Sequence, residues 1–426
     1  MIRQKQLWPW MIAAIGFVAL VAAAGFRATP GALVEPLQNE FGWSTGTIGF
    51  AMSVNLALYG VTAPFASALM ERYGVRKVTA VAMTLIALGS GLAIFMTASW
   101  QLVMLWGVLV GLGAGSISLG FVATIGTRWF VKRQGLVTGL LTAGGATGSL
   151  IFLPVVAKLS ESDGGWRTAA IVTSLVAFAT VPFVLLFFRE HPADVGIPPY
   201  GADEVVPAPE PTRNAGRLAV DALKSASHSK AFWVLAAAFA ICGATSNGLI
   251  NTHFIPAAHD HGMPSVTAAG LLALIGVFDL VGTVVSGWLS DRYDPRKLLA
   301  VYYGLRGLSL LVLPQLFDDK VTGFMLIFVI FFGLDFIATV PPTVALCREH
   351  FGMSAPIVFG WVFAAHQLGA AFAATMAGVT RDGFGTYAPA WYAAGALCMG
   401  AAALSLWTRR RPETVEDTLI KEPARA

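Results

Sequence analysis

The sequence has little charge for its length. Of its 426 residues only 12 % are Asp, Glu, Lys or Arg, whereas 56 % are hydrophobic. Ordinary soluble proteins carry about 25 % charged residues, twice this fraction. A soluble fold of this size could not cover its surface with so few charged side chains. The composition therefore excludes a soluble globular protein and predicts an integral membrane protein.

Cysteine is also scarce. Cys242, Cys347 and Cys398 all fall inside apolar stretches, which argues against a disulfide framework and a thiolate metal site. The net charge is only +4, and the basic residues are scattered over short polar stretches, so we expect no binding of nucleic acid. The sequence contains no metal-ligand cluster, nucleophile elbow or phosphate-binding glycine loop. We therefore expect neither an enzyme nor a resident cofactor or metal ion.

Long apolar runs fill most of the chain. Hydropathy over windows of about 19 residues separates twelve of them, six before and six after one polar segment: 9–35, 45–70, 78–97, 101–126, 135–157, 168–188, 231–256, 267–290, 298–316, 321–346, 355–379 and 386–408. Each is mostly uncharged and long enough to cross a bilayer as a helix. None has the period-two alternation of a barrel strand. The first run follows Arg3 and Lys5 as in a signal peptide, but it continues to Val34, so we interpret it as an uncleaved span.

The sequence thus predicts an all-α membrane protein with twelve transmembrane helices in two six-helix bundles. The predicted parts are an N-terminal bundle, a cytoplasmic linker, a C-terminal bundle and a cytoplasmic tail: 1–188, 189–230, 231–408 and 409–426. The linker has six prolines and eleven charges and cannot bury a core. Within it, residues 218–223 predict a short interfacial helix.

Basic residues predict the orientation in the membrane. With the N-terminus inside, 22 Arg and Lys residues lie on the cytoplasmic side and four on the other side. The positive-inside rule then places both termini in the cytoplasm. We expect a multi-pass protein of the plasma membrane, which in a bacterium is the inner membrane.

One charged pattern occurs twice, at the same place in each half. An acid, an Arg and a Tyr follow one another after the second and the eighth run, with Arg-Lys three residues later. Ordinary loop charge explains the basic residues but not the ordered repetition. The bases follow a helix C-terminus, where the dipole is negative. We interpret the pattern as a cytoplasmic latch formed by Glu71, Arg72, Arg76, Asp291, Arg292 and Arg296.

This arrangement resembles the major facilitator superfamily, whose signature between helices 2 and 3 is G-x-x-x-D-R/K-x-G-x-R/K. The first copy departs from it at Ser67 and Glu71, and the second at Asp294. The resemblance implies an alternating-access transporter. It also implies a central cavity lined by helices 1, 2, 4, 5, 7, 8, 10 and 11.

Further segments resemble the monocarboxylate-porter branch of that superfamily: 41–44 (FGWS), 128–136 (RWFVKRQGL), 251–254 (NTHF), 341–343 (PPT) and 366–369 (HQLG). The glycine-rich segment 143–149 lacks the proline of drug/proton antiporters, which weighs against efflux. The pair Pro341-Pro342 must interrupt the hydrogen-bond ladder of the tenth span, and a gate hinge is one hypothesis for it.

Few ionisable residues lie inside the spans, and each is a candidate for function because charge is costly there. They are Arg27, His253, Asp279, Arg306, Asp335 and His366. At a rise of about 1.5 Å per residue, Asp279, Arg306, Asp335 and His366 lie near the midplane. Arg27 and His253 lie toward the outer mouth.

Two of these residues have distinct expected roles. We interpret Arg27 as the cation that receives a substrate carboxylate; the alternative is an arginine that snorkels to the interface. The resemblance implies Asp-x-x-x-Arg on helix 8, where the Asp couples protons and the Arg binds the carboxylate. Here Asp279 stands as the expected proton carrier, but Thr283 replaces the arginine. The anion must then rely on Arg27, His253 or His366, or the substrate differs.

The remaining candidates have open alternatives. Arg306 and Asp335 form a structural ion pair, or Arg306 switches between Asp335 and Asp279. His253 and His366 contact the ligand, relay protons or pack. Secondary contacts to the substrate are expected from Asn55, Tyr59, Asn247 and Asn251.

The sequence therefore predicts a secondary active transporter of a small organic anion, a monocarboxylate, driven by proton symport. We expect it to act as a monomer in the lipid bilayer. Export or antiport of a larger amphiphilic compound is the alternative, because the helix 8 arginine is missing and aromatic residues are abundant. A non-transporting membrane sensor is the rival from another class.

Overall fold

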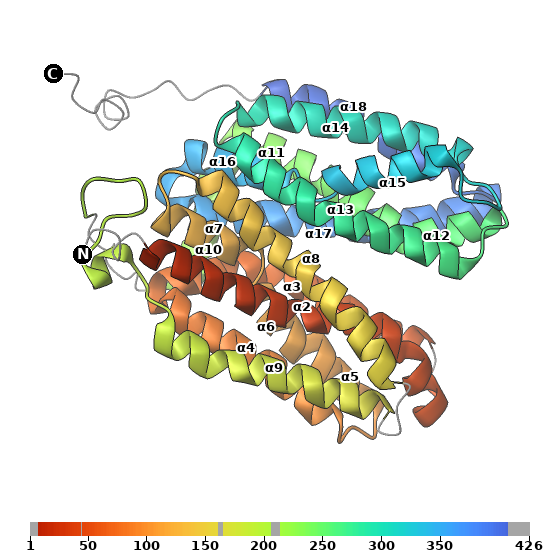
Figure 1. Ribbon diagram of the computed structural model, residues 1–426, viewed down its shortest axis with the longest axis horizontal. Helices are drawn as coiled ribbons and strands as arrows, with labels where there is room; N and C mark the ends of the chain where they lie inside the picture. The colour runs from red at the N-terminus through yellow and green to blue at the C-terminus, as the bar shows by residue number, and fades with distance from the viewer. Residues whose placement is uncertain (1–6, 44, 161–164, 206–213, 408–426) are drawn as a thin grey trace.

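The computed structural model describes residues 7–43, 45–160, 165–205 and 214–407, and these are almost entirely helical. At several helical positions, above all 26–35, it describes the backbone alone. Figure 1 shows two bundles of helices, one formed by α2 to α9 and the other by α11 to α18.

The first bundle contains long helices with short connections. Their bounds are α2 (Leu7–Phe41), α3 (Thr45–Tyr73), α4 (Val75–Ala93), α5 (Ser99–Leu102), the π-helical η1 (Val103–Val110), α6 (Gly111–Ser116), α7 (Leu119–Trp129), α8 (Gln134–Ser160) and α9 (Gly165–Phe187). The segments from α5 to α7 follow one another within a single apolar stretch, Ser99–Trp129. A turn at Ile117 and Ser118 interrupts that stretch.

The second bundle repeats this organisation after the linker, which contains η2 (Pro192–Val195) and α10 (Ala215–Ser227). Its helices are α11 (Lys230–Gly243), the π-helical η3 (Ala244–Ile250), α12 (Asn251–Asp260), α13 (Ser265–Ser290), α14 (Pro295–Val312), η4 (Leu313–Gln315), α15 (Gly323–Asp335), α16 (Val340–Phe351), η5 (Gly352–Ser354), α17 (Ala355–Phe384) and α18 (Ala388–Trp407).

Within the described ranges, eleven helical stretches are long and apolar enough to cross a membrane. One of them, Gly323–Arg381, is 59 residues long and contains α15, α16 and all but the last three residues of α17. The sequence had predicted two runs in this region, near 321–346 and 355–379. A multi-span helical membrane protein is thus confirmed.

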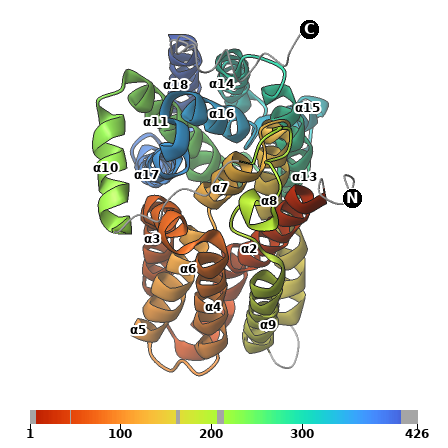
Figure 2. The ribbon, with the colours of Figure 1, turned by 90° about the vertical axis from the view of Figure 1, so that its left-hand side faces the viewer.

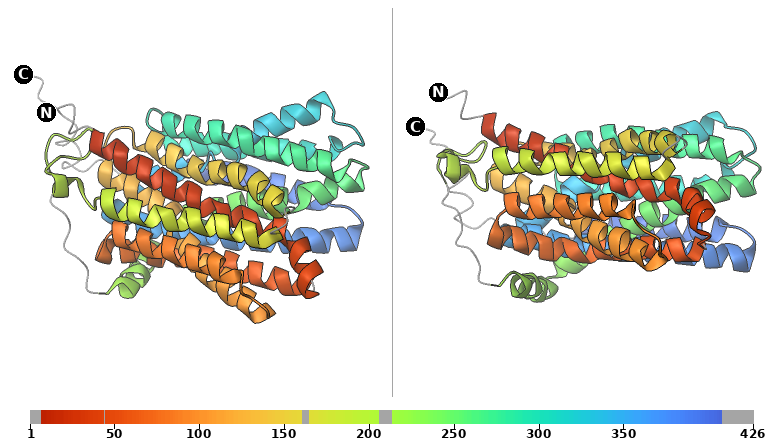
Figure 3. Two further views of the ribbon diagram at one scale, coloured as in Figure 1. Left: turned by 60° about the horizontal axis from the view of Figure 1, so that its bottom comes forward. Right: turned by 90° about the horizontal axis from the view of Figure 1, so that it is seen from below.

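The two bundles meet through small residues at one end. A Cβ atom on Gly135 of α8 would lie 2.4 Å from the carbonyl oxygen of Gly287 on α13, and one on Gly139 would lie 2.6 Å from that of Thr283. The start of α2 and the end of α18 lie at this end (Figure 1), and Figure 3 shows the same arrangement from two further sides. Glycine therefore permits backbone contact between the bundles, as expected for helices that associate in lipid.

The tenth predicted span is broken as its sequence predicted. Helix α15 ends at Asp335 and α16 begins at Val340, with Pro341 and Pro342 in its first turn. Residues 336–339 between them form turns. Proline fits the first turn of a helix because its missing N–H has no partner there in any case. The double proline thus starts a new helix rather than bending an old one.

Helix α10 joins the two bundles from the outside. It runs from Ala215 to Ser227, longer than the predicted 218–223, and Figure 2 shows it beside α3 and α17. Its alanines at 215, 219, 222 and 226 are buried. The indole nitrogen of Trp361 on α17 donates to the carbonyl oxygen of Ala219 at 2.9 Å. The polar face remains outside, as in a helix that lies along an interface.

Candidate functional site

A cavity of about 710 Å³ lies between the two bundles. Its lining comes from α2, α3, α6, α7 and α8 of the first bundle, from α11, η3, α12, α13 and α17 of the second, and from the break before α16. These are segments of the eight spans that the family resemblance implied. The volume falls within the range of about 300–1,000 Å³ that is typical of small-molecule sites.

The chemistry of the two walls differs. The second bundle supplies most of the polar lining: Cys242, Ser246, Asn247, Asn251, Asp279, His366 and Gln367. The first bundle supplies aliphatic and small residues together with Tyr59, Ser118, Thr142 and Ser149. Among the described lining residues, Asp279 is the one carboxylic acid, and no Arg or Lys occurs. Both sides of the cavity therefore combine apolar surface with hydrogen-bonding groups, and the second bundle supplies the amides, the imidazole and the carboxyl group.

Arg27, the predicted anion-binding residue, belongs to the helical stretch Leu7–Phe41. Its side chain lies outside the described part of the structure. Its role therefore stays a prediction.

Asp279 lies on the cavity wall and is almost completely buried, with 3 % of its surface exposed. Its Oδ1 accepts a hydrogen bond from the hydroxyl of Thr283 at 2.9 Å and another from the backbone N–H of Ile337 at 3.0 Å. Thr283 stands where the resembled family has its arginine. In this chain that position therefore orients the acid instead of presenting a cation to the cavity.

The hydrogen bond from Ile337 belongs to a larger arrangement around the break at 336–339. The carbonyl oxygens of Asp335 and Phe336 accept from Nη2 of Arg306, the latter at 2.9 Å. The hydroxyl of Ser286 donates to the carbonyl oxygen of Ala338. Backbone groups freed in a membrane interior must find partners, and here side chains of α13 and α14 supply them. The side chains of Phe336 and Ile337 meanwhile line the cavity.

Arg306 is fully buried and its guanidinium is fully engaged. Its Nε donates to Oδ2 of Asp335 at 2.6 Å, and Nη1 donates to Sγ of Cys242 at 3.1 Å. A longer contact of 3.5 Å joins Nη1 to the hydroxyl of Thr245. Arg306 is not among the cavity-lining residues. In this conformation it pairs with Asp335 and holds the break, the arrangement expected of a structural ion pair.

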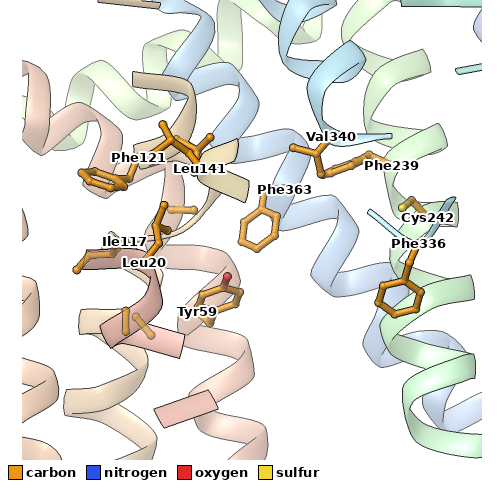
Figure 4. Close-up of a cluster of buried hydrophobic side chains, with 14 of the residues drawn as sticks. Leu20, Tyr59, Ile117, Phe121, Leu141, Phe239, Cys242, Phe336, Val340 and Phe363 are labelled. Atoms are coloured by element: carbon orange, nitrogen blue, oxygen red, sulfur yellow. The ribbon is translucent and has the colours of Figure 1, made fainter. Parts of the chain in front are cut away.

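His366 and Cys242 lie next to each other on the cavity wall. The ring of His366 packs between Phe239 and Phe363, at centroid distances of 4.8 and 5.8 Å. In Figure 4, Phe363 faces Tyr59 of the first bundle, and Phe336 lies beside Cys242. The rings of Tyr59 and Phe363 are 5.3 Å apart and almost perpendicular. Aromatic contacts therefore connect the two bundles across the cavity.

The other polar candidates divide into two groups. Asn247 and Asn251 line the cavity, and the amide of Asn251 donates to Oδ1 of Asn247 at 3.0 Å. His253 does not line it; its Nε2 donates to the carbonyl oxygen of Ala374 on α17 at 2.8 Å. Asn55 also lies away from the lining, since its amide donates to the carbonyl oxygen of Trp106 in η1 at 2.7 Å. The last two residues tie neighbouring helices together.

The two acids of the repeated pattern, Glu71 and Asp291, bind partners far away along the chain. Glu71 forms an ion pair of 2.7 Å with Arg128 at the end of α7. Asp291 accepts the backbone N–H groups of Gly135 and Leu136 at 2.7 and 2.9 Å, at the start of α8 in the opposite bundle. A carboxylate at a helix N-terminus is favoured by the helix dipole. This acid therefore bridges the two bundles.

The basic members of the predicted latch make no bond to the opposite bundle among the contacts described for them. Arg296 pairs with Asp294, which also accepts its backbone N–H at 3.0 Å. The guanidinium groups of Arg72 and Arg292 lie over the rings of Tyr73 and Trp288, at 4.8 and 3.9 Å from the ring centres. The backbone N–H of Arg76 binds the carboxylate of Glu190 at 3.2 Å.

Glu190, Arg128, Ser286 and Cys242 are functional candidates that the sequence did not reveal as such. Burial raises the pKa of the Glu190 carboxyl above its ordinary value, against the effect of hydrogen bonds from the backbone of Arg76 and Val75. Glu190 lies in the polar linker, more than 110 residues from Arg76 along the chain. No local pattern could have joined the two.

Comparison with known proteins places the chain among transporters. The sequence matches the family described as Major Facilitator Superfamily over residues 15–373 and again over 281–425. An uncharacterised MFS-type transporter of Bacillus subtilis, YcxA, is 24 % identical over 389 residues, which are 89 % of this chain and 90 % of that protein. Human monocarboxylate transporter 11 is 26 % identical over 404 residues, which are 93 % of this chain and 82 % of the relative.

Solved structures show the same fold. The proton:xylose symporter XylE, bound to 6-bromo-6-deoxy-D-glucose, superimposes with a TM-score of 0.70 at 16 % identity. The alignment covers 94 % of this chain and 96 % of the symporter.

Proposed function

Because the chain belongs to the Major Facilitator Superfamily, we propose that it is a secondary active transporter that moves a small organic anion, a monocarboxylate, together with protons. As a member of that family it is a transporter rather than an enzyme, and an integral multi-pass protein of the plasma membrane. The observation that carries the proposal is the cavity between the bundles, with the buried acid Asp279 on its wall.

The proposed topology has twelve spans with both termini in the cytoplasm. It assigns α15 with α16 to one crossing and α17 to the next, both within Gly323–Arg381. The bias of 22 to 4 basic residues supports this orientation. The bundles then meet at the cytoplasmic end, and the conformation is closed on that side.

In the proposed cycle, Arg27 neutralises the substrate carboxylate and Asp279 carries the proton. Asp279 is suited to this role because it faces the cavity while its Oδ1 holds the backbone of Ile337. A change in its protonation therefore acts directly on the segment that precedes α16. The monocarboxylate transporter among the relatives supports this substrate class.

Transport by purified protein in vesicles tests the proposal. We expect Arg27→Ala to abolish uptake of a labelled short monocarboxylate such as lactate, since a guanidinium favours the bound carboxylate. Asp279→Asn is expected to remove the stimulation by an inward proton gradient and to spare exchange of labelled for unlabelled substrate. Asp203→Asn, at an exposed linker position, is the control. Gradient dependence that persists in Asp279→Asn would exclude this residue as the proton carrier.

Export or antiport of a larger amphiphilic compound is the second candidate. It is favoured by the absence of Arg and Lys from the described part of the cavity wall and by the many apolar residues that line both of its sides. Competition separates the two candidates. If the protein transports a monocarboxylate, short carboxylates at millimolar concentration should inhibit transport into the vesicles. If it transports a larger amphiphilic compound, hydrophobic cations should inhibit it instead.

A further inference from the structure

One of the three thiols reaches the central cavity. All three thiols are buried, but Cys242, near the end of α11, is among the lining residues of the cavity, whereas Cys347 and Cys398 are not. Figure 4 draws Cys242 together with Phe336, which also lines the cavity. The proposed transport cycle makes no use of this sulfur.

Hydrogen-bond donors surround the sulfur. Nη1 of Arg306 donates to Sγ at 3.1 Å, and the hydroxyl of Thr339 lies 3.2 Å from it. A guanidinium next to a cysteine stabilises negative charge on sulfur, and the charged form is the nucleophile. The ion pair of Arg306 with Asp335 reduces this effect without removing it, because Nη1 itself points to the sulfur.

A base lies beside the same thiol. His366 is 7 % exposed and lines the cavity, and within the described residues its buried Nδ1 has no hydrogen-bond partner. Glycine brings its helix close to α11. A Cβ atom on Gly243 would lie 1.9 Å from the carbonyl oxygen of His366, and one on Gly369 would lie 2.1 Å from that of Ala240. The backbones of α11 and α17 are therefore in contact next to Cys242, and His366 and Cys242 line the same wall of the cavity.

We propose that Cys242 is a covalent modification site for small soft electrophiles that enter the cavity, with His366 as the base. Cysteine beside histidine is the arrangement of an activated nucleophile. In the reaction with a maleimide, the imidazole of His366 takes the thiol proton and sulfur attacks one alkene carbon. The carbon–sulfur bond forms as the π electrons move to the other alkene carbon, which then takes the proton back. The adduct occupies the cavity next to Phe336 and stops transport.

N-ethylmaleimide and peptide mass spectrometry test the site without a known substrate. On the folded, purified full-length chain, we expect Cys242 to react at least about tenfold faster than Cys347 and Cys398, which do not line the cavity. Cys242→Ser should remove the fast adduct. Cys398→Ser should leave the fast adduct unchanged. This variant is a matched control, because the charge of Arg306 also acts on the Cys398 thiol although Cys398 does not line the cavity. Equal rates for all three thiols, or modification of Cys242 only after denaturation, would overturn the proposal.

The role of His366 is tested separately. His366→Gln keeps a polar side chain of similar size without a base, and we expect it to slow the modification of Cys242 about tenfold or more. Its unfolding temperature should stay near that of the wild type, which distinguishes loss of the base from loss of structure. If His366→Gln does not fold, His366→Asn replaces it. An unchanged rate in a folded variant would remove His366 from the proposal.

Discussion

Buried charge in this protein gathers around one turn of backbone. Arg306, Asp335 and Asp279 come from three helices, and each binds backbone or side-chain groups at the break before α16. A buried ion pair contributes little net stability compared with apolar residues, but removal of one partner is costly. The two acids and the arginine therefore have to be considered together.

Arg306→Met should be strongly destabilising. It leaves the carboxylate of Asp335 and the carbonyl oxygen of Phe336 without their partner in a buried site. The expected loss is roughly 3–5 kcal/mol, measured as a lower unfolding temperature of the purified protein. The double variant Arg306→Met with Asp335→Leu should lose much less, because no uncompensated charge remains. Equal losses in the single and the double variant would contradict a paired role.

Glu190 provides a pH-dependent prediction outside the membrane. In the folded protein, burial raises the pKa of this carboxyl above its ordinary value of 4.5. Its contribution to stability is therefore present at low pH and is lost as the pH rises through the folded-state pKa. Between pH 4.5 and neutrality the unfolding temperature of Glu190→Gln should accordingly rise relative to the wild type. Glu204→Gln, at an exposed position of the same linker, is the control and should follow the wild type at every pH.

Helix contacts give a prediction at the scale of elements. A Cβ atom on Gly282 of α13 would lie 1.9 Å from the carbonyl oxygen of Leu334 on α15. Gly282→Ala should therefore push α15 away, disturb the bonds of Asp335 and lower the unfolding temperature by several degrees. Gly276→Ala is a matched control on the same helix, because its nearest neighbour would be 3.8 Å away. Similar unfolding temperatures for the two variants would show that α13 and α15 do not pack this closely.

The elements also show what the sequence could predict. The break in the tenth span was predicted because Pro341 and Pro342 lack an N–H, a property of the residues themselves. The groups that satisfy the freed backbone were not predicted, since Arg306 and Ser286 lie 30 and 52 residues away from the carbonyl groups of Phe336 and Ala338 that they bind. Likewise the π-helical η1 arises inside an uninterrupted apolar run with no local signal.

The candidate site was predicted in part for the same reason. Depth along a helix follows from residue counting, and Asp279 and His366 do lie on the cavity wall. The side of the helix on which a side chain lies depends on how the helices pack. His253 and Asn55 bind neighbouring helices and do not line the cavity. The latch pattern singled out Glu71, which lies in the last turn of α3, and Asp291, which follows α13. It could not show that Asp291 binds the start of α8, which requires the two bundles to be in contact.

At the scale of the whole molecule, Asp291 connects the two bundles through its hydrogen bonds to the start of α8. Asp291→Asn weakens the two hydrogen bonds to the start of α8, because a neutral amide is a poorer acceptor at a helix N-terminus. We expect a larger population open at this end, measured as longer distances between spin labels on α8 and α13. Asp294→Asn is the control, because Asp294 binds Arg296 within its own loop. Unchanged distances in Asp291→Asn would exclude it as a lock.

The glycine contact between α8 and α13 has a kinetic consequence. Gly135 and Gly139 meet Gly287 and Thr283 through main-chain atoms, so no interlocking rotamers have to flip before the two surfaces part. The activation enthalpy for separation at that end then comes from breaking polar bonds between the bundles, those of Asp291 with the start of α8 and that of Arg348 with Gln134, and a bulky residue at 139 would hold the two helices apart.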